Sequence, residues 1–125
     1  MYTAKLKKDI RCPLEYALDV FGGKWKSRII CTLGMNTTMR FSEIRTELGN
    51  ITDTMLSGSL KGLLEDGMIT RAQFNEIPPR VEYALTEKGT SVIPLLFSIN
   101  KWGYDHGGEE IIGICTGCPS RQCEG

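Results

Sequence analysis

From residue 41 to residue 66 the chain reads FSEIRTELGNITDTMLSGSLKGLLED. Apolar residues at helical spacing predict a short helix that ends at Gly49 and Asn50. Thr52 then suits the N-cap of a second helix, which runs to Asp66 and stops before Gly67. Two short helices joined by a tight turn that contains glycine form the layout of a helix-turn-helix.

Two further helices are predicted on the N-terminal side of this stretch. Pro13 suits the first turn of a helix, where its missing N–H costs nothing, and the apolar periodicity then continues to the glycine pair at 22–23. A second periodic pattern covers residues 24–33, with Gly34 in the position of a C-terminal glycine cap. Residues 39–40 give a short extended segment between these helices and the helix-turn-helix.

A hairpin and a last helix are predicted on the C-terminal side. Residues 68–74 and 80–85 have strand character, and the prolines within residues 75–79 require a loop because they cannot donate to a strand ladder. Thr86 is positioned to cap a long final helix. The fold class expected is therefore mainly α with a small β-hairpin wing (α+β), a winged helix-turn-helix.

The last helix is apolar on two sides. Val92, Leu96 and Ile99 mark one stripe, and Ile93, Phe97 and Tyr104 mark another about 100° around a helix of 3.6-residue period. One stripe can cover the helix's own domain, whereas so short a chain has few elements left to cover the other. The pattern predicts a partner for the second stripe, and Pro94 is expected to kink the helix or lie near its start.

The composition of the 125 residues restricts the function. Fifteen basic and fifteen acidic residues cancel, so any binding to DNA must depend on a local basic surface. The N-terminus has no apolar signal-peptide region and no apolar run approaches the roughly 20 residues that span a bilayer, which predicts a cytoplasmic protein with no membrane partner.

Catalytic and metal-binding residues are scarce. His106 is the only histidine, and no spacing supplies a metal-ligand set or an activated serine, so we expect no enzyme, no cofactor and no metal. Cys115, Cys118 and Cys123 give three thiols in a glycine-rich tail, one fewer than a tetrahedral zinc site needs. Cys12 or a second subunit could supply a fourth, but thiols in a tail of low order are the favoured interpretation.

Six motifs at the joints of these elements occur together: CPLEY from residue 12, GGKWK from 22, RFSEI from 40, LEDGMI from 64, PPRVEY from 78 and LTEKG from 85. From about Cys12 to Tyr104 the chain resembles the HxlR-type regulators, relatives of the MarR group. The resemblance implies a DNA-binding transcriptional regulator that forms a homodimer through its N-terminal and last helices. Residues 1–110 would form the DNA-binding and dimerisation domain, and residues 111–125 a Cys/Gly-rich tail.

The second helix of the helix-turn-helix has an apolar arc and a polar arc. Leu56, Leu60, Leu63 and Leu64 form the core-facing arc at a 3.6-residue period. Candidate contacts to double-stranded DNA lie on the other side: Thr54, Ser57, Gly58, Ser59 and Lys61. A solvated helix face is the commoner explanation of such residues. The resemblance favours the DNA groove, and Gly58 and Gly62 would permit close backbone approach.

Further phosphate contacts are expected outside this helix. Arg80 follows the proline loop, where a wing arginine can reach the minor groove or a phosphate; an ordinary strand-edge cation is the alternative. Weaker candidates for phosphate contacts lie at the starts of two other helices: Arg40 and Ser42 at one, Lys24 and Lys26 at the other. A solvated charge is the alternative for Lys26.

Cys12 is a candidate sensing thiol. It directly precedes a helix whose first N–H groups stabilise a thiolate, and Lys7, Lys8 and Arg11 add positive charge nearby. Packing as a plain buried cysteine, as expected of Cys31, is the alternative. The resemblance implies that a cysteine near this helix responds to electrophiles or oxidants in several family members.

Two functions from different classes remain. The first is a homodimeric regulator on a pseudo-palindromic operator, responsive to an oxidant or a small electrophile. The second is a winged-helix protein-interaction module that does not bind DNA, which zero net charge and small residues in the recognition helix favour. A basic stripe that unites Lys24, Lys26, Arg40, Lys61 and Arg80 would favour the first.

Overall fold

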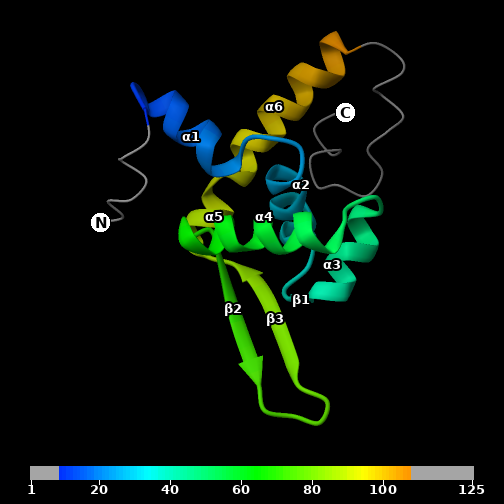
Figure 1. The fold of residues 1–125 in the computed structure, drawn as a ribbon. Coiled ribbons are helices and arrows are strands. Elements are labelled where there is room, and N and C mark those ends of the chain that lie inside the picture. Colours follow the sequence, from blue (N-terminus) through cyan, green and yellow to red (C-terminus); the bar gives the residue numbers. More distant parts are fainter. Residues whose placement is uncertain (1–8, 108–125) are drawn as a thin grey trace.

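The computed structural model describes residues 9–107, which form helices and a small sheet (Figure 1). In chain order the elements are α1 (Pro13–Phe21), α2 (Lys26–Met35), β1 (Met39–Arg40), α3 (Phe41–Leu48), α4 (Asp53–Glu65), β2 (Ile69–Phe74), β3 (Arg80–Leu85), α5 (Glu87–Ser91) and α6 (Ile93–His106). The tail at 111–125, with its three cysteines, lies outside the described residues.

The sheet is antiparallel with the strand order β1-β3-β2. Met39 pairs with Tyr83 where β1 joins the sheet, and β2 pairs with β3 along its whole length, from Ile69 opposite Leu85 to Phe74 opposite Arg80. Beyond β1 the two long strands continue away from the helices as a separate arm, the wing (Figure 1). The winged helix-turn-helix predicted from the sequence is confirmed.

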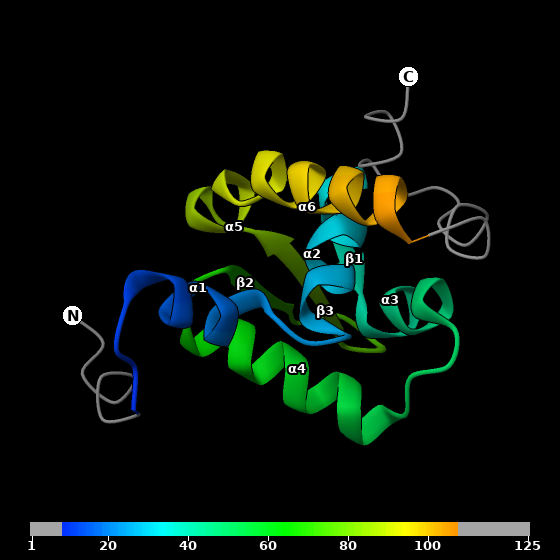
Figure 2. The same cartoon turned by 90° about the horizontal axis from the view of Figure 1, so that it is seen from above.

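The core lies between α2 and the elements around it. Ile29 and Ile30 of α2 and Leu56 and Leu63 of α4 are fully buried, so the predicted apolar arc of the fourth helix is the one that faces the core. Figure 2 shows α4 and α6 on opposite sides of the molecule with α2 between them. Burial of an aliphatic side chain of this size stabilises a fold by about 1.5–3 kcal/mol, so these contacts fix α4 to the scaffold.

Local capping signals set several element ends. The Thr52 hydroxyl accepts a hydrogen bond from Met55 N at 3.1 Å, and the Thr86 hydroxyl accepts one from Gly89 N at 3.0 Å. Gly67, with φ 73°, takes the left-handed conformation after α4 that side chains rarely adopt. The predicted caps of α4 and of the helix after β3 are confirmed.

Two helix boundaries differ from the sequence prediction. Helix α2 begins at Lys26 and continues through Gly34 to Met35, so Gly34 is an interior residue and not a cap. A Cβ on Gly34 would lie 3.1 Å from the Ile93 side chain, so glycine leaves room for the start of α6. The predicted long last helix is divided at Val92 into α5 and α6, and Pro94 lies in the first turn of α6.

The apolar faces of α6 also differ from the prediction. Val92 and Leu96 are buried, but Ile99, assigned to the same stripe, is half exposed. The second predicted stripe, Ile93, Phe97 and Tyr104, is half-buried within the monomer. The row left exposed is instead Leu95, Ile99 and Trp102. No helix within residues 9–107 has the length and apolar character that crossing a membrane requires.

Candidate nucleic-acid interface

Helix α4 presents a polar face beside the wing. It crosses one side of the molecule above the base of the hairpin (Figure 1). Thr54, Ser57, Gly58 and Lys61 are exposed on it, and Ser59 is half-buried. These are the side chains that sequence analysis assigned to DNA. Hydroxyl groups can donate to or accept from base edges and phosphates, and an ammonium can neutralise a phosphate.

The two glycines of α4 have different surroundings. A Cβ on Gly58 would meet nothing within 4 Å, so the protein itself gives no reason for glycine there. A Cβ on Gly62 would lie 3.0 Å from the end of the Lys26 side chain. The expectation that both glycines lie open on the groove side is therefore wrong for Gly62, which accommodates a lysine of α2.

Two of the predicted phosphate contacts have partners within the protein. The Lys26 ammonium lies 3.5 Å from the carbonyl oxygen of Asp19, and the end of this side chain lies beside Gly62 of α4. The Lys24 ammonium lies 4.8 Å from the centre of the Trp25 ring, a cation–π distance. Lys26 therefore also connects α2 with α1 and α4, whereas the cation–π contact of Lys24 is with the residue next to it.

The start of α3 has a more open arrangement. Arg40 and Ser42 are exposed, and the backbone N–H of Arg40 donates to the Glu43 carboxylate at 2.8 Å, which caps the helix. A cation that was not predicted lies on this helix: Arg45 forms an ion pair with Asp53 at 2.9 Å, across the turn of the helix-turn-helix. Both side chains are more than half exposed, so the pair contributes little to stability but orients two charges at the start of α4.

Arg80 at the wing is held by neighbours on the same hairpin. Its guanidinium lies 3.1 Å from the Glu76 carboxylate and 3.3 Å from that of Glu82, and it stacks over the Phe74 ring at 4.3 Å. Only 27% of its side chain is exposed. Of the five cations grouped in the sequence analysis, Lys24, Arg40 and Lys61 are exposed, whereas Lys26 and Arg80 are half-buried and have partners within the protein.

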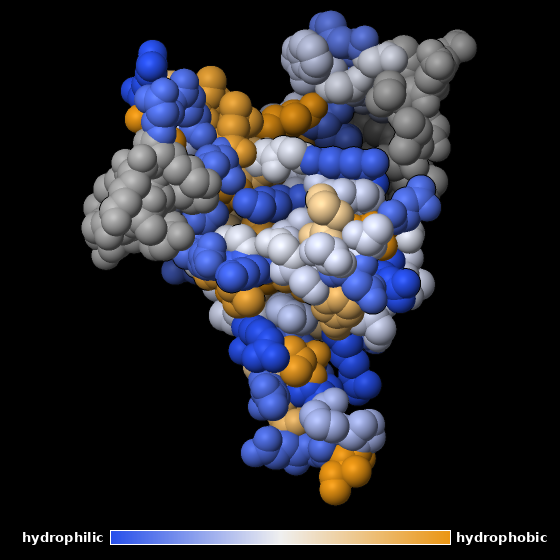
Figure 3. Space-filling view, in the orientation of Figure 1, coloured by the Kyte–Doolittle hydropathy of each residue, from blue (hydrophilic) through white to orange (hydrophobic). Residues whose placement is uncertain are grey.

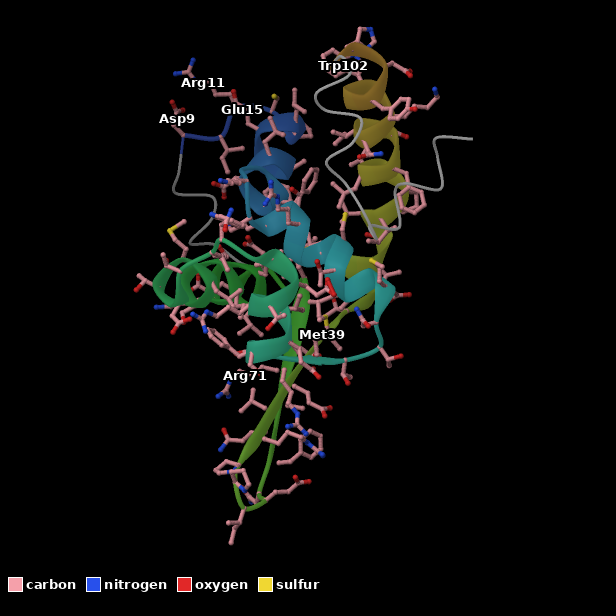
Figure 4. All side chains as sticks on the ribbon, turned by 90° about the vertical axis from the view of Figure 1, so that its right-hand side faces the viewer. Asp9, Arg11, Glu15, Met39, Arg71 and Trp102 are labelled. Atoms are coloured by element: carbon pink, nitrogen blue, oxygen red, sulfur yellow. The ribbon has the colours of Figure 1, made fainter. Side chains whose placement is uncertain are left out.

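A second surface lies away from α4. Helices α1 and α6 diverge as two arms at the end of the molecule opposite the wing (Figure 1), and Figure 3 shows hydrophobic residues on α1 and between the two arms. Figure 4 places Trp102 near the outer end of α6. The large apolar side chains between 47% and 66% exposed on these arms are Leu14, Leu18, Leu95, Ile99 and Trp102.

Comparison with known proteins shows which family the sequence belongs to. The sequence model of the HxlR-like helix-turn-helix matches residues 20–111. The chain belongs to this family. An HTH-type transcriptional regulator of Methanothermobacter thermautotrophicus is 46% identical over 99 residues, which cover 79% of this chain and 75% of that protein. The HxlR-like chain is accordingly a DNA-binding transcriptional regulator and not an enzyme.

Solved structures of regulators share the fold. The redox regulator HypR in its oxidised form superposes with a TM-score of 0.70 at 38% identity, covering 75% of this HxlR-like chain and 96% of that one. The reduced form of the transcriptional regulator YodB from Bacillus subtilis gives a TM-score of 0.69 at 32% identity, covering 78% and 95%. Both similarities extend over about three quarters of this chain and nearly the whole of each regulator.

Cys12 of the HxlR-like regulator is exposed at the N-cap of α1, and its carbonyl accepts the N–H of Glu15 at 3.0 Å. The charge around it is more balanced than the sequence suggested. Arg11 pairs with Asp9 at 3.2 Å, and the backbone N–H of Arg11 donates to Glu15 at 2.7 Å. Lys7 and Lys8 lie outside the described residues, and Cys31 is half-buried against the core.

Lys88 is a connection within the HxlR-like fold that sequence analysis missed. Its ammonium donates to the carbonyl of Asp66, at the end of α4, at 2.8 Å, and lies 3.0 Å from the Tyr16 hydroxyl of α1. One side chain from α5 thereby joins the arm to the polar helix. Within residues 9–107 no group of three His, Cys, Asp or Glu residues could hold a metal ion.

Proposed function

We propose that this regulator binds a pseudo-palindromic operator as a homodimer, with α4 of each subunit in the major groove. The observation that carries the proposal is the exposed face of α4, whose side chains are small and polar around Lys61 and Gly58. A two-fold dimer presents such helices to half-sites about 34–36 Å apart. A protein that acts on chromosomal DNA would work in the cytoplasm, as the sequence predicts.

The two arms support the dimer. Five large side chains on α1 and α6 are about half exposed or more in the monomer, and an apolar surface of this kind marks an interaction site. We propose that a second copy covers it and that residues 1–110 form the DNA-binding and dimerisation unit, followed by the tail at 111–125.

The DNA contacts fall into two groups under this proposal. Thr54, Ser57 and Ser59 would bond to base edges and nearby phosphates, while Gly58 lets the helix backbone approach the groove. Arg40 and Ser42 would contact the backbone of the same half-site from α3. Lys26 would reach a phosphate only after leaving the Asp19 carbonyl, so its contribution is expected to be smaller.

Lys61→Ala tests the electrostatic part of this proposal. Lys61 is exposed on α4, so its removal should leave the fold intact and delete one phosphate contact per subunit. Each lost contact should lower the slope of log K against log salt by about one. Affinity for an operator duplex, measured by fluorescence anisotropy at several salt concentrations, provides both values. An unchanged affinity and slope would favour the protein-interaction module instead.

We also propose that Cys12 is the thiol through which an electrophile or oxidant regulates binding. Its exposure at the start of an arm supports the proposal, because a modification there would alter the surface that meets the second subunit. The redox regulator HypR, which shares the fold, also supports it.

N-ethylmaleimide, which forms a thioether with a thiolate, tests the role of Cys12. We expect mass spectrometry to show the exposed Cys12 labelled faster than the half-buried Cys31, with loss of operator binding in parallel. Cys12→Ser should keep its DNA binding under the same treatment, whereas Cys31→Ser should respond like the wild type. Equal loss of binding in Cys12→Ser would contradict the proposal.

A further inference from the structure

The tip of the wing carries an unusual side chain for a surface expected to meet DNA. Ile77 lies in the loop between β2 and β3 and is 102% exposed, the highest value among the exposed large hydrophobic residues within 9–107. The hydrophobic colour at the far end of the wing is visible in Figure 3. Pro78 and Pro79 follow it, and their rings fix two φ angles next to the apolar side chain.

The charge of the wing offers little attraction to phosphates. Residues 69–85 contain two arginines and two glutamates, so their charges cancel. Arg80 forms ion pairs with Glu76 and Glu82, and its guanidinium lies over one face of the Phe74 ring. Its charge and its planar surface are therefore already in contact with residues of the hairpin. Arg71 is exposed, but it lies near the base of the wing, close to the helices (Figure 4).

We propose that the wing tip binds DNA through Ile77, which packs against the sugar and base walls of the minor groove, and that Arg80 is a positioning residue for the tip. The inference rests on the proposed function and deepens it. Proteins that bind the minor groove frequently place apolar side chains such as isoleucine against the bases, and this contact does not depend on attraction to phosphates. This replaces the expectation that Arg80 itself reaches the groove or a phosphate.

The first test compares affinity with salt dependence. A duplex is first selected by the wild-type protein from a random-sequence library, and Ile77→Ala, Gln73→Ala and Arg80→Gln are then titrated on it. Ile77→Ala should weaken binding roughly tenfold, as expected when an aliphatic side chain loses its burial, with an unchanged salt slope. Gln73→Ala, a truncation on an exposed wing position away from the tip, should stay within about twofold of the wild type.

The second test locates the contact in the minor groove. Guanine carries an amino group there that inosine lacks, so G·C at the position under the wing should bind the wild type more weakly than I·C. Ile77→Ala should not distinguish the two duplexes. This difference between duplexes would not arise if Ile77 only shaped the loop.

The outcomes separate the inference from the proposed function. If no duplex is selected, the proposed function fails and the inference fails with it. If a duplex is selected but Ile77→Ala binds it like the wild type, or Arg80→Gln alone lowers the salt slope by about one, the inference is overturned while DNA binding stands.

Discussion

Replacing Ile99 with glutamate is expected to produce a folded monomer. Ile99 is half exposed in the isolated subunit, so a carboxylate at this position stays in water while the protein is monomeric. In the proposed dimer the same position lies among Leu95 and Trp102, and burial of an unpaired charge there would cost several kcal/mol. A loss of that size changes a dimerisation constant by a thousandfold or more at 1.4 kcal/mol per tenfold.

Sedimentation equilibrium and circular dichroism together check this result. The variant should sediment as a monomer with the wild-type helical content. Its affinity for the selected operator should fall because the two DNA-binding subunits are no longer joined to each other. Lys101→Glu is the matched control, because it adds a glutamate to α6 outside the apolar row and breaks only an exposed pair with Asp105. A dimeric Ile99→Glu protein would exclude this face as the interface.

Gly58→Glu is expected to separate stability from DNA binding. Glycine in a helix interior is less favourable than most residues by up to about 1 kcal/mol, and a Cβ here meets no protein atom, so the variant should be at least as stable as the wild type. On DNA the added carboxylate would meet base edges and phosphates at close range. The loss should be on the order of a hundredfold, equivalent to one or two base contacts at 1–3 kcal/mol each.

The matched variant Gly58→Ala distinguishes charge from bulk. It should show the same or greater gain in melting temperature, with a smaller loss of affinity. If Gly58→Glu instead lowers the melting temperature and leaves DNA binding unchanged, α4 does not meet the groove with this face.

Local signals in the sequence were sufficient for most of the fold. Thr52 and Thr86 cap helices through bonds to residues three positions along the chain, so both ends could be predicted from short motifs. For the last helix the sequence predicted only that Pro94 would kink it or lie near its start, and Pro94 lies in the first turn of α6. Pro94 has no N–H to donate and its ring crowds the carbonyl four residues earlier, which permitted either a kink or a new helix start.

The site was less predictable because its charges are set by contacts between distant elements. Nothing near Lys26 in the sequence shows that a glycine of α4 provides space for its side chain, or that the Asp19 carbonyl accepts its ammonium. Lys88 likewise joins α5 to Tyr16, 72 positions away. Residue type alone identified the cations, whereas only the fold shows which of them have partners within the protein.

In the proposed complex, the α4 faces of two subunits read one operator. The most direct measurement is selection of DNA from a random-sequence library by the wild-type protein, followed by hydroxyl-radical footprinting, with Gly58→Glu carried through in parallel. We expect the wild type to enrich an inverted repeat whose protected centres lie about one helical turn apart, near 34–36 Å, and the variant to enrich none. Enrichment of the same repeat by both proteins, or of no sequence by the wild type, would contradict it.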